Sequence, residues 1–182
     1  MVNIYELELT NLQQVILRLL FVKAGTSLNQ RQIAKKLGVS PPAVMKALPF
    51  LEKKNLIKVH QDTESKRWSV ELNRENHKAM QLKKVDNLKQ IYETGLADAL
   101  EEAFAGATII LFGSYSRGDD TDNSDIDIAI IGRKEKKIDL SAFENIHERP
   151  ININFYESWQ KIHKNLKENL FNGIVLTGGV EL

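Results

Sequence analysis

The sequence predicts an α+β protein built from two domains and a connecting helix. Residues 1–73 contain three helical periods followed by two strand-like runs, and residues 74–105 continue with a long helical period. Residues 106–182 alternate apolar strand-like runs with helical segments, which is typical of a mixed sheet with helices. We therefore expect an N-terminal domain of three helices and a β-hairpin, a linker helix, and a C-terminal domain whose helices cover mainly one face of its sheet.

The composition is that of an ordinary globular protein. Hydrophobic residues make up 42% and charged residues 27%, and the net charge of +1 gives no global field that would attract nucleic acid. Cysteine is absent, which excludes disulfides and thiol chemistry. The chain shows no basic and apolar leader, and its apolar runs are too short to cross a bilayer. We expect a cytoplasmic protein without a membrane partner.

Three short amphipathic helices are expected in the N-terminal domain. The first covers residues 10–21, and the second covers residues 29–37 and ends at Gly38. The third is capped by Ser40 and opens with two prolines, which a first helical turn tolerates. Pro49 lies inside this third helix and is expected to kink or shorten it. The apolar stripe of the first helix is expected to consist of Leu12, Val15, Ile16, Leu19 and Leu20.

A hairpin follows these helices, because residues 57–60 and 67–72 have the character of strands joined by a charged tip. The preceding stretch, LNQRQIAKKLGVSPPAVMKALPFLEKKNLIKV, resembles the winged helix-turn-helix family over its whole length. This resemblance implies that the third helix enters the major groove of double-stranded DNA and that the tip of the wing touches phosphate. The residues expected to make these contacts are Ser40 and Lys46 on the third helix and Lys66 and Arg67 on the wing.

The local charge supports DNA binding by this domain, but the third helix offers few polar contacts. Residues 1–72 hold eleven Lys and Arg against six Asp and Glu, an excess of five positive charges. The exposed start of the third helix carries only Ser40 and Lys46 as obvious contacts to bases or phosphate. Two interpretations stay open, namely a DNA-binding domain and a winged-helix domain used for dimerisation or packing.

Residues 74–105 are predicted to form one long helix or two joined helices, with Gly95 as the expected break. The helix is expected to be a spacer that packs on one or both domains, or the seam of a homodimer. Its apolar stripe is expected to comprise Leu82, Val85, Leu88, Tyr92, Leu96, Ala99, Ala103 and Phe104. Its solvated face is expected to carry Lys78, Lys83, Lys84 and Lys89.

Two carboxylates and a glycine turn are the chemically distinctive part of the C-terminal domain. Asp125 and Asp127 are two residues apart in a predicted strand and therefore share a face. Like charges this close repel each other unless a cation lies between them, and a divalent metal with oxygen ligands is the usual solution. Gly113 lets the backbone approach a ligand closely, and the N–H groups of the helix that follows are able to hold a phosphate.

The run GSYSRGDDTDNSDIDIAII resembles the signature of the minimal nucleotidyltransferases of the DNA polymerase β-type superfamily, in which Gly-Ser is followed by Asp-x-Asp. The resemblance implies that Asp125 and Asp127 are catalytic carboxylates that bind Mg²⁺ or Mn²⁺, and that Gly113 and Ser114 hold the triphosphate of a nucleoside triphosphate. Arg117 is expected either to contact phosphate or to pair with an aspartate of the acidic loop that follows it. The loop itself is expected to be solvated.

The superfamily places a third carboxylate on a neighbouring strand, where it shares a metal and helps to deprotonate the nucleophile. The predicted strand 151–156 carries Asn152 and Asn154 on the corresponding face. An amide brings no negative charge and cannot act as a base. Glu157 is near in sequence, but strand alternation puts it on the opposite face. Three interpretations stay open: a slow enzyme, an enzyme with another base, or a domain that binds nucleotide and metal without transferring.

Two functions from different classes follow from these patterns. The first is a nucleotidyltransferase-like protein that binds a nucleoside triphosphate with Mg²⁺ and transfers a nucleotide to an unidentified acceptor. The second is a winged-helix transcriptional regulator that binds DNA and uses a weakened nucleotidyltransferase domain as a sensor or scaffold. Small nucleotidyltransferases also act as antitoxins, which adds a partner protein as a third alternative.

Overall fold

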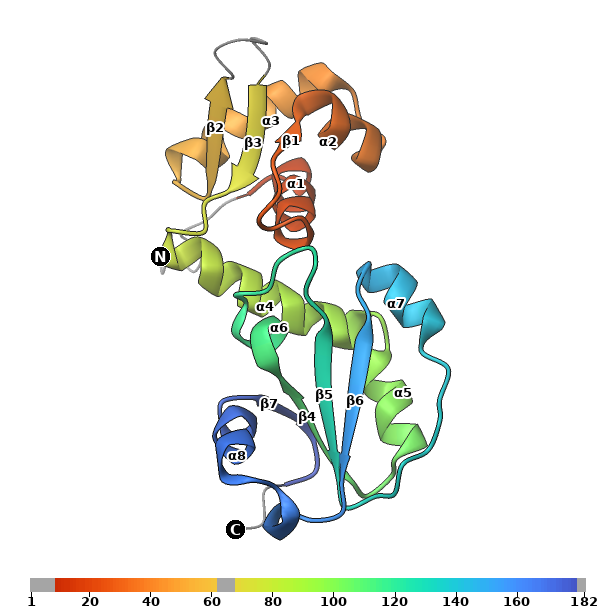
Figure 1. Ribbon diagram of the computed structural model, residues 1–182. Coiled ribbons are helices and arrows are strands. Elements are labelled where there is room, and N and C mark those ends of the chain that lie inside the picture. The colour runs from red at the N-terminus through yellow and green to blue at the C-terminus, as the bar shows by residue number, and fades with distance from the viewer. Residues whose placement is uncertain (1–8, 62–67, 180–182) are drawn as a thin grey trace, which may run out of the picture. The chain divides into compact units, whose positions relative to one another are not determined.

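The computed structural model describes residues 9–61 and 68–179 of the chain. The chain divides into two compact units, Met1–Met80 and Gln81–Leu182, whose helices and strands are labelled in Figure 1. Among the described residues, no helix combines the length and the apolar character that crossing a lipid bilayer requires.

Three capped helices form most of the first unit. They are α1 (Asn11–Val22), α2 (Gln30–Leu37) and α3 (Pro41–Lys53). Each begins after a side chain that accepts a backbone N–H three residues ahead, and these caps are Thr10, Asn29 and Ser40. Gly38 ends α2 in the left-handed conformation, as the sequence predicts. The predicted shortening at Pro49 is wrong, because α3 continues to Lys53, with Pro49 on its exposed side.

A three-stranded antiparallel sheet completes the first unit. Its strands are β1 (Leu28–Asn29), β2 (Ile57–Gln61) and β3 (Trp68–Leu72), in the order β1-β3-β2. The buried Val70 on the central strand pairs with Leu28 on one side and Val59 on the other. The predicted winged helix, three helices with a hairpin, is therefore confirmed. The two-residue β1 was not expected, because two residues are too short to show the alternation of a strand.

The buried face of α1 is rotated relative to the predicted stripe. Its buried residues are Gln13, Ile16, Leu17, Leu20 and Phe21. Val15, predicted to be buried, is 45% exposed. Gln13 is accommodated in the core because its side-chain amide donates a hydrogen bond to the Ala47 carbonyl, 3.4 Å away. Apolar residues on adjacent helical stripes leave the choice of face to the tertiary packing.

Two helices, α4 (His77–Glu93) and α5 (Leu96–Ala103), occupy most of the predicted linker region. Gly95 separates them with a φ of 77°, a left-handed conformation that glycine adopts readily, so the expected break is present. The predicted apolar stripe is wrong at Val85 and Tyr92, which are 65% and 48% exposed. Polar residues take several of the buried positions on α4, and apolar spacing cannot detect these.

A mixed sheet forms the centre of the second unit. Its strands are β4 (Thr108–Phe112), β5 (Ile126–Ile131), β6 (Ile151–Tyr156) and β7 (Ile174–Thr177). They lie in the order β6-β5-β4-β7, with β5 and β6 parallel and the other neighbours antiparallel. The mixed sheet is therefore as predicted. The parallel pairing of β5 with β6 sets the residues of the candidate site side by side.

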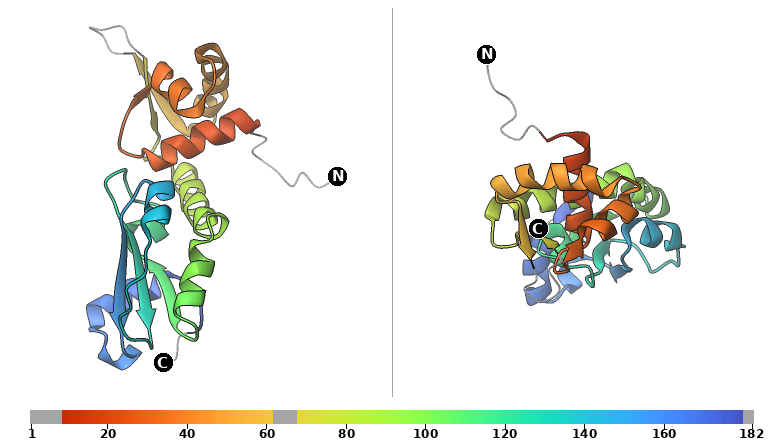
Figure 2. Two further views of the ribbon diagram at one scale, coloured as in Figure 1. Left: turned by 90° about the vertical axis from the view of Figure 1, so that its right-hand side faces the viewer. Right: turned by 90° about the horizontal axis from the view of Figure 1, so that it is seen from above.

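Helices lie on both faces of this sheet (Figure 2). The face of Ile126, Ile128 and Ile130 packs against α4 and α5, and Phe143 of α7 (Ser141–His147) packs on the same core. The opposite face carries Ile110 and Ala129 and is partly covered by α8 (Lys164–Phe171) and by Trp159. Helices thus cover mainly one face, as expected.

Residues 159–171 do not form one continuous helix. The segment is divided into a 3₁₀ turn, η1 (Trp159–Lys161), and α8. Ile162 between them has extended backbone, with a ψ of 129°. Trp159 in the 3₁₀ turn, Ile162 after it and Leu170 in α8 nevertheless bury their side chains in one core.

Candidate functional site

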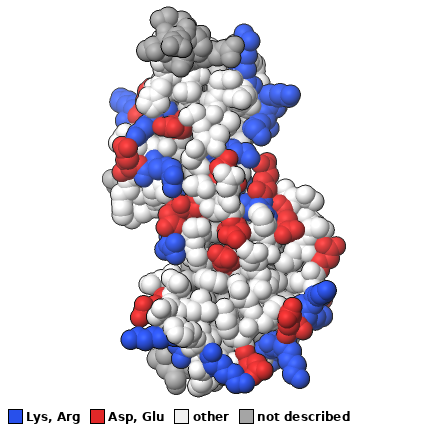
Figure 3. All heavy atoms as spheres, viewed as in Figure 1, with Lys and Arg blue, Asp and Glu red and all other residues white. Residues whose placement is uncertain are grey.

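Asp125 and Asp127 lie on one face of the sheet, at the end where β5 begins. Asp127 is in register with Phe112 of β4 and with Asn152 of β6, and Asp125 directly precedes β5. Both aspartates are half-buried. Figure 3 shows acidic side chains at the surface over the start of β5, beside uncharged surface. The strand alternation predicted from the sequence thus holds, with Ile126 buried on the other face.

The surroundings of Asp127 shift the pKa of its carboxyl group. Burial raises the pKa of Asp127, and the charge of Asp125 raises this pKa further. A hydrogen bond from the Asn152 side chain and the charge of Arg117 act in the opposite direction and lower the pKa of Asp127. A cation between the two carboxylates would remove their repulsion.

Gly113 brings the backbone into contact with Asp127. It begins the short helix α6 (Gly113–Arg117) directly after β4, with a φ of 74°. A Cβ atom at this position would overlap the Asp127 carboxylate, so a side chain here would displace that carboxylate. The Ser116 hydroxyl donates a hydrogen bond to the Gly113 carbonyl, 2.9 Å away, which holds the turn. The turn that begins at Gly113 therefore contacts the strand that carries Asp125 and Asp127. The contact is at Gly113 itself, which cannot be replaced without strain.

Asn152 occupies the position beside the aspartates on the third strand. The parallel register sets Asn152 next to Asp127 and Asn154 next to Ala129, so Asn154 lies further along the strand. The Asn152 side-chain N–H donates a hydrogen bond to the Asp125 carboxylate. An amide N–H group therefore contacts the acidic pair directly at this position.

Glu157 lies at the opposite end of the sheet from the aspartates. It follows β6, five residues beyond Asn152, which corresponds to about 16 Å along a strand. Its exposed carboxylate pairs with Lys161 one helical turn later. Glu157 also lines a cavity of about 550 Å³, whose wall includes Trp159 and Thr177 but neither aspartate. Glu157 is thus remote from Asp125 and Asp127.

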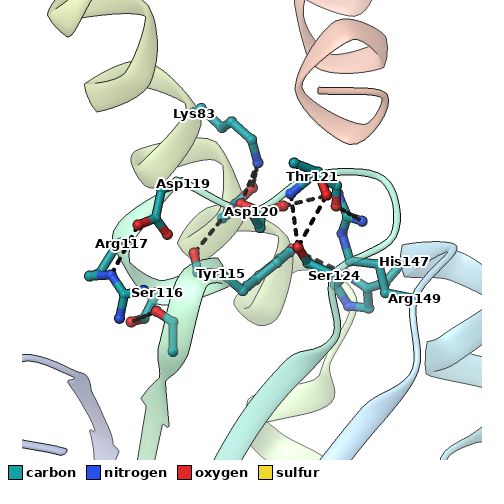
Figure 4. A network of polar contacts seen from close by, with 12 residues as sticks. Lys83, Tyr115, Ser116, Arg117, Asp119, Asp120, Thr121, Ser124, His147 and Arg149 are labelled. Carbon is teal, nitrogen blue, oxygen red and sulfur yellow. Dashed lines mark hydrogen bonds and ion pairs between the residues drawn. The ribbon is translucent and has the colours of Figure 1, made fainter. Parts of the chain in front are cut away.

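The acidic loop between α6 and β5 is fixed by a buried carboxylate. Asp120 is fully buried and forms ion pairs with Lys83 of α4 and with Arg149, which comes just before β6. Arg149 Nη2 lies 2.9 Å from Asp120 Oδ2, although that oxygen accepts no hydrogen bond of good geometry. Asn87 donates a further hydrogen bond of 2.7 Å to Asp120 Oδ1. Figure 4 shows Lys83 and Arg149 reaching Asp120 from different elements, Lys83 from α4 and Arg149 from the segment before β6.

This network overturns two sequence predictions. The loop was expected to be solvated, but Asp120 has no exposed surface. Lys83 was expected on the solvated face of its helix, but it is fully buried, and burial lowers the pKa of its ammonium group. The sequence carries no signal for this arrangement, because Lys83 and Asp120 are 37 positions apart and have no motif in common.

The same network holds the backbone leading to Asp125. Arg149 donates to the Thr121 carbonyl, and the Thr121 N–H donates to the Ser124 hydroxyl, 2.9 Å away. The Arg149 guanidinium also lies over the Tyr115 ring, 5.9 Å from its centroid. Residues from α4, α6 and the segment before β6 thus fix the loop that ends at the aspartates.

The remaining predicted contact residues lie at the surface or outside the described part of the chain. Arg117 is exposed and its Nε donates to Asp119 at 3.2 Å, which is the pairing that the sequence offered as one alternative. Lys46 is exposed on α3, and the Ser40 hydroxyl accepts the Ala43 N–H at 3.3 Å. The predicted wing contacts, Lys66 and Arg67, lie outside the described residues.

The acidic residues at the site are two in number, where the superfamily pattern has three. Over residues 9–61 and 68–179, no cluster of three or more His, Cys, Asp or Glu side chains is placed to hold a metal ion. A metal at this site would therefore take two carboxylates from the protein and its remaining oxygens from a ligand or water. Magnesium sites in nucleotide-binding proteins commonly have this composition.

Comparison with known families accounts for both parts of the chain. The model of the nucleotidyltransferase domain family matches residues 94–177, and the model of the MarR family matches residues 9–68. The chain joins a MarR winged-helix domain to a nucleotidyltransferase domain. The Gly113 turn, both aspartates and Asn152 fall inside the first match, and α1, α2 and α3 fall inside the second.

Several solved structures resemble part of the chain. A mutant MepR from a multidrug resistant clinical isolate of Staphylococcus aureus is 30% identical over 42% of this chain and 56% of that chain, with a TM-score of 0.37. AdcR from Streptococcus pyogenes is 26% identical over 54% and 69%, with a TM-score of 0.42. A ZitR mutant from Lactococcus lactis is 28% identical over 56% and 66%, with a TM-score of 0.43. No curated protein matches the chain.

Proposed function

We propose that the nucleotidyltransferase domain binds a nucleoside triphosphate together with Mg²⁺, or Mn²⁺, and transfers its nucleotidyl group to an acceptor. The single observation that carries this proposal is the contact between the Gly113 turn and Asp127, with Asp125 beside it. Gly113 and Ser114 would hold the triphosphate, and Asp125 and Asp127 would hold the metal. Arg117, whose charge acts on Asp127, would stabilise phosphate.

The residues present fit one divalent cation. Two carboxylates on one face, one with a pKa raised partly by the other, form a donor set with excess negative charge. Phosphate oxygens of the nucleotide would complete the coordination of a hard cation such as Mg²⁺. The bound ion would neutralise the triphosphate and polarise its oxygens. The protein side chains would orient the nucleotide through the Gly113 turn and the fixed loop before Asp125.

Transfer would join an acceptor oxygen to the α-phosphorus, break the bond to the β-phosphate and release pyrophosphate. The acceptor hydroxyl must also lose a proton. Asn152 lies where a carboxylate base would be expected, and an amide cannot accept this proton. Binding and transfer are therefore separate properties of this domain and need separate measurements.

Calorimetry of the full chain with ATP, GTP, CTP and UTP in Mg²⁺ tests the binding part. We expect at least one nucleotide to bind, and binding to be lost in Asp125→Asn and Asp127→Asn, because an amide supplies no charge for the cation. The matched control is Asp139→Asn, an exposed aspartate that accepts the Ser141 N–H at 3.0 Å, a role that asparagine can keep. If none of the four nucleotides binds, the proposed function fails.

The transfer part is tested with nucleoside triphosphates labelled at the α-phosphate. The full chain is incubated with each nucleotide and Mg²⁺ or Mn²⁺, alone and with cellular RNA or protein. Label that appears on a macromolecule, together with released pyrophosphate, would support transfer. Nucleotide binding without label or pyrophosphate would refute transfer and leave binding in place.

A second candidate function is a DNA-binding regulator whose nucleotidyltransferase domain binds nucleotide as a sensor or serves as a scaffold. Asn152 is the observation that favours it, because an amide replaces the acid beside Asp125 and Asp127. The MarR match over residues 9–68 supports DNA binding by the other domain. This function predicts an affinity for duplex DNA that falls steeply with salt, and no release of pyrophosphate. Fluorescence anisotropy with a labelled duplex, measured from low to physiological salt, checks the first prediction.

A further inference from the structure

The exposed ridge of α3 has an unusual composition for a helix that would read DNA. The helix buries Val44, Ala47, Leu48 and Leu51. The exposed side of its first three turns consists of Pro41, Pro42, Met45, Lys46 and Pro49, which we call the α3 ridge. Met45 is 55% exposed, which is high for a large apolar side chain. The ridge is thus apolar except for Lys46.

The chemistry of these side chains limits what they can recognise. Proline and methionine side chains donate no hydrogen bond, and the lysine ammonium is a donor without an acceptor. Ser40, which precedes the helix, accepts the Ala43 N–H and keeps one O–H donor for a single contact. The ridge therefore has no side chain that pairs in a bidentate way with adenine and none that accepts from cytosine. Two features of the major groove remain within its chemistry: the acceptors of guanine, and the C5 methyl group of thymine.

Cations on the neighbouring helix favour a nucleic acid as the occupant of this ridge. α2 carries Arg31, Lys35 and Lys36, all exposed, and no acidic residue. Figure 3 shows Lys and Arg side chains gathered over α2. Lys46 and Lys53 add exposed cations on α3 itself, against one exposed acidic residue, Glu52 in its last turn. An apolar ridge flanked by positive charge suits a polyanion that presents methyl groups, whereas an apolar protein surface would gain nothing from these cations.

We propose that the α3 ridge reads double-stranded DNA through thymine methyl groups, contacted by Pro42, Met45 and Pro49, and through one guanine contacted by Lys46. This inference rests on the proposed DNA binding by the MarR domain and adds the class of sequence that it selects. The preferred half-site contains several thymines in the major groove and a guanine within their span. Each buried methyl group is expected to change the affinity about fourfold, from the free energy of burying one methylene.

The experiment begins with selection of duplexes from a random library by the full chain at one fixed salt concentration. Each thymine of the selected site is then replaced by deoxyuridine, which removes the C5 methyl and leaves the pairing edge unchanged. We expect a loss of about fourfold at each contacted thymine. Replacement of the guanine is expected to weaken binding by roughly tenfold or more, and Lys46→Ala should abolish the preference for guanine at that position.

Met45→Ala provides the decisive comparison. If Met45 contacts a thymine methyl, the variant should bind equally tightly to two duplexes that differ only by thymine or deoxyuridine at the contacted position. At the other thymine positions the variant should still prefer thymine to deoxyuridine. The control variants are Val15→Ala, which truncates an apolar side chain that is 45% exposed on α1, and Lys53→Ala in the last turn of α3. Both controls should keep the full preference for thymine and guanine.

The outcomes separate this inference from the function on which it rests. If no duplex binds at low salt, DNA binding itself fails and the inference falls with it. If DNA binds with salt dependence but with equal affinity for thymine and deoxyuridine, only the inference is overturned. A dimer that dissociates on Met45→Ala, with that same equal affinity, would instead assign the ridge to contact with a second copy of the chain.

Discussion

Replacement of Asp120 by asparagine tests whether the buried charges hold the nucleotidyltransferase domain together. Asp120, Lys83 and Arg149 are at most 2% exposed in their side chains, and they place one negative charge between two positive ones. Asp120→Asn keeps the shape of the side chain but leaves two buried cations without their counter-charge. Breaking a buried ion pair in this way costs about 3–5 kcal/mol, and a small domain has only about 5–15 kcal/mol of stability. We expect the melting temperature of this domain to fall on the order of 20 °C.

The pH dependence of this loss follows from Lys83. Burial lowers the pKa of Lys83 below its ordinary value of 10.5, so the unfolded chain binds the proton more tightly than the folded one. Between the lowered folded pKa and 10.5, the free energy of unfolding therefore rises with pH. In Asp120→Asn, where the raising effect of Asp120 is gone, the folded pKa falls further and this window widens. Part of the lost stability should return as the pH is raised from about 7 to about 9.

The assay is thermal and urea unfolding of the full chain, followed by calorimetry and circular dichroism. Lys83→Met is the informative partner variant, because it leaves Asp120 and Arg149 as a balanced pair and should cost much less than Asp120→Asn. Asp119→Asn is the surface control, since Asp119 is exposed and pairs only loosely with Arg117, so it should change stability by no more than about 1 kcal/mol. If Lys83→Met costs as much as Asp120→Asn, the argument from charge balance is refuted.

Further predictions concern the candidate site. Gly113→Ala should destabilise the domain by roughly 1–3 kcal/mol and abolish nucleotide binding, because the φ of Gly113 is 74° and an added Cβ would overlap Asp127. The control is Gly179→Ala, whose Cβ meets nothing within 4 Å. Equal melting temperatures of the two variants would contradict this prediction. Asp127→Asn should raise the melting temperature of the metal-free protein, because it removes a negative charge that burial and the charge of Asp125 both disfavour. An unchanged or lower melting temperature would argue against repulsion between the two carboxylates. Because the pKa of Asp127 is raised, Mn²⁺ binding to the unmodified chain should weaken as the pH falls through that pKa. Calorimetry between about pH 7 and 4 should show the loss of affinity at a pH higher than the pKa of an ordinary aspartate. Asn152→Asp should tighten Mn²⁺ binding by adding a third carboxylate beside the two aspartates. The control is Asn154→Asp, two residues further along β6 beside Ala129, which should leave the affinity unchanged.

Local signals predicted most of the regular structure. The strand at residues 151–156 has the predicted bounds, because its isoleucines alternate with asparagines and strand alternation has a period of two. The capping residue Ser40 and the stop at Gly38 were readable because each acts on backbone groups within a few residues. The pairing of Asp125 with Asp127 follows from the same two-residue period.

Tertiary contacts decided the rest. Lys83 and Asp120 are individually ordinary surface residue types, and only the packing of α4 against the loop makes them a buried pair. The choice of Gln13 over Val15 as a buried residue of α1 likewise depends on Ala47, 34 positions away.

The sequence alone was sufficient to name the two domains, through their resemblance to known families. Strand alternation was sufficient to set Asp125 and Asp127 on one face. The sequence could not decide which asparagine of the third strand stands beside the aspartates, because that depends on the register between β5 and β6. The fold sets Asn152, and not Asn154 or Glu157, at this position. Register is a property of two strands paired through space, and no period within one strand contains it.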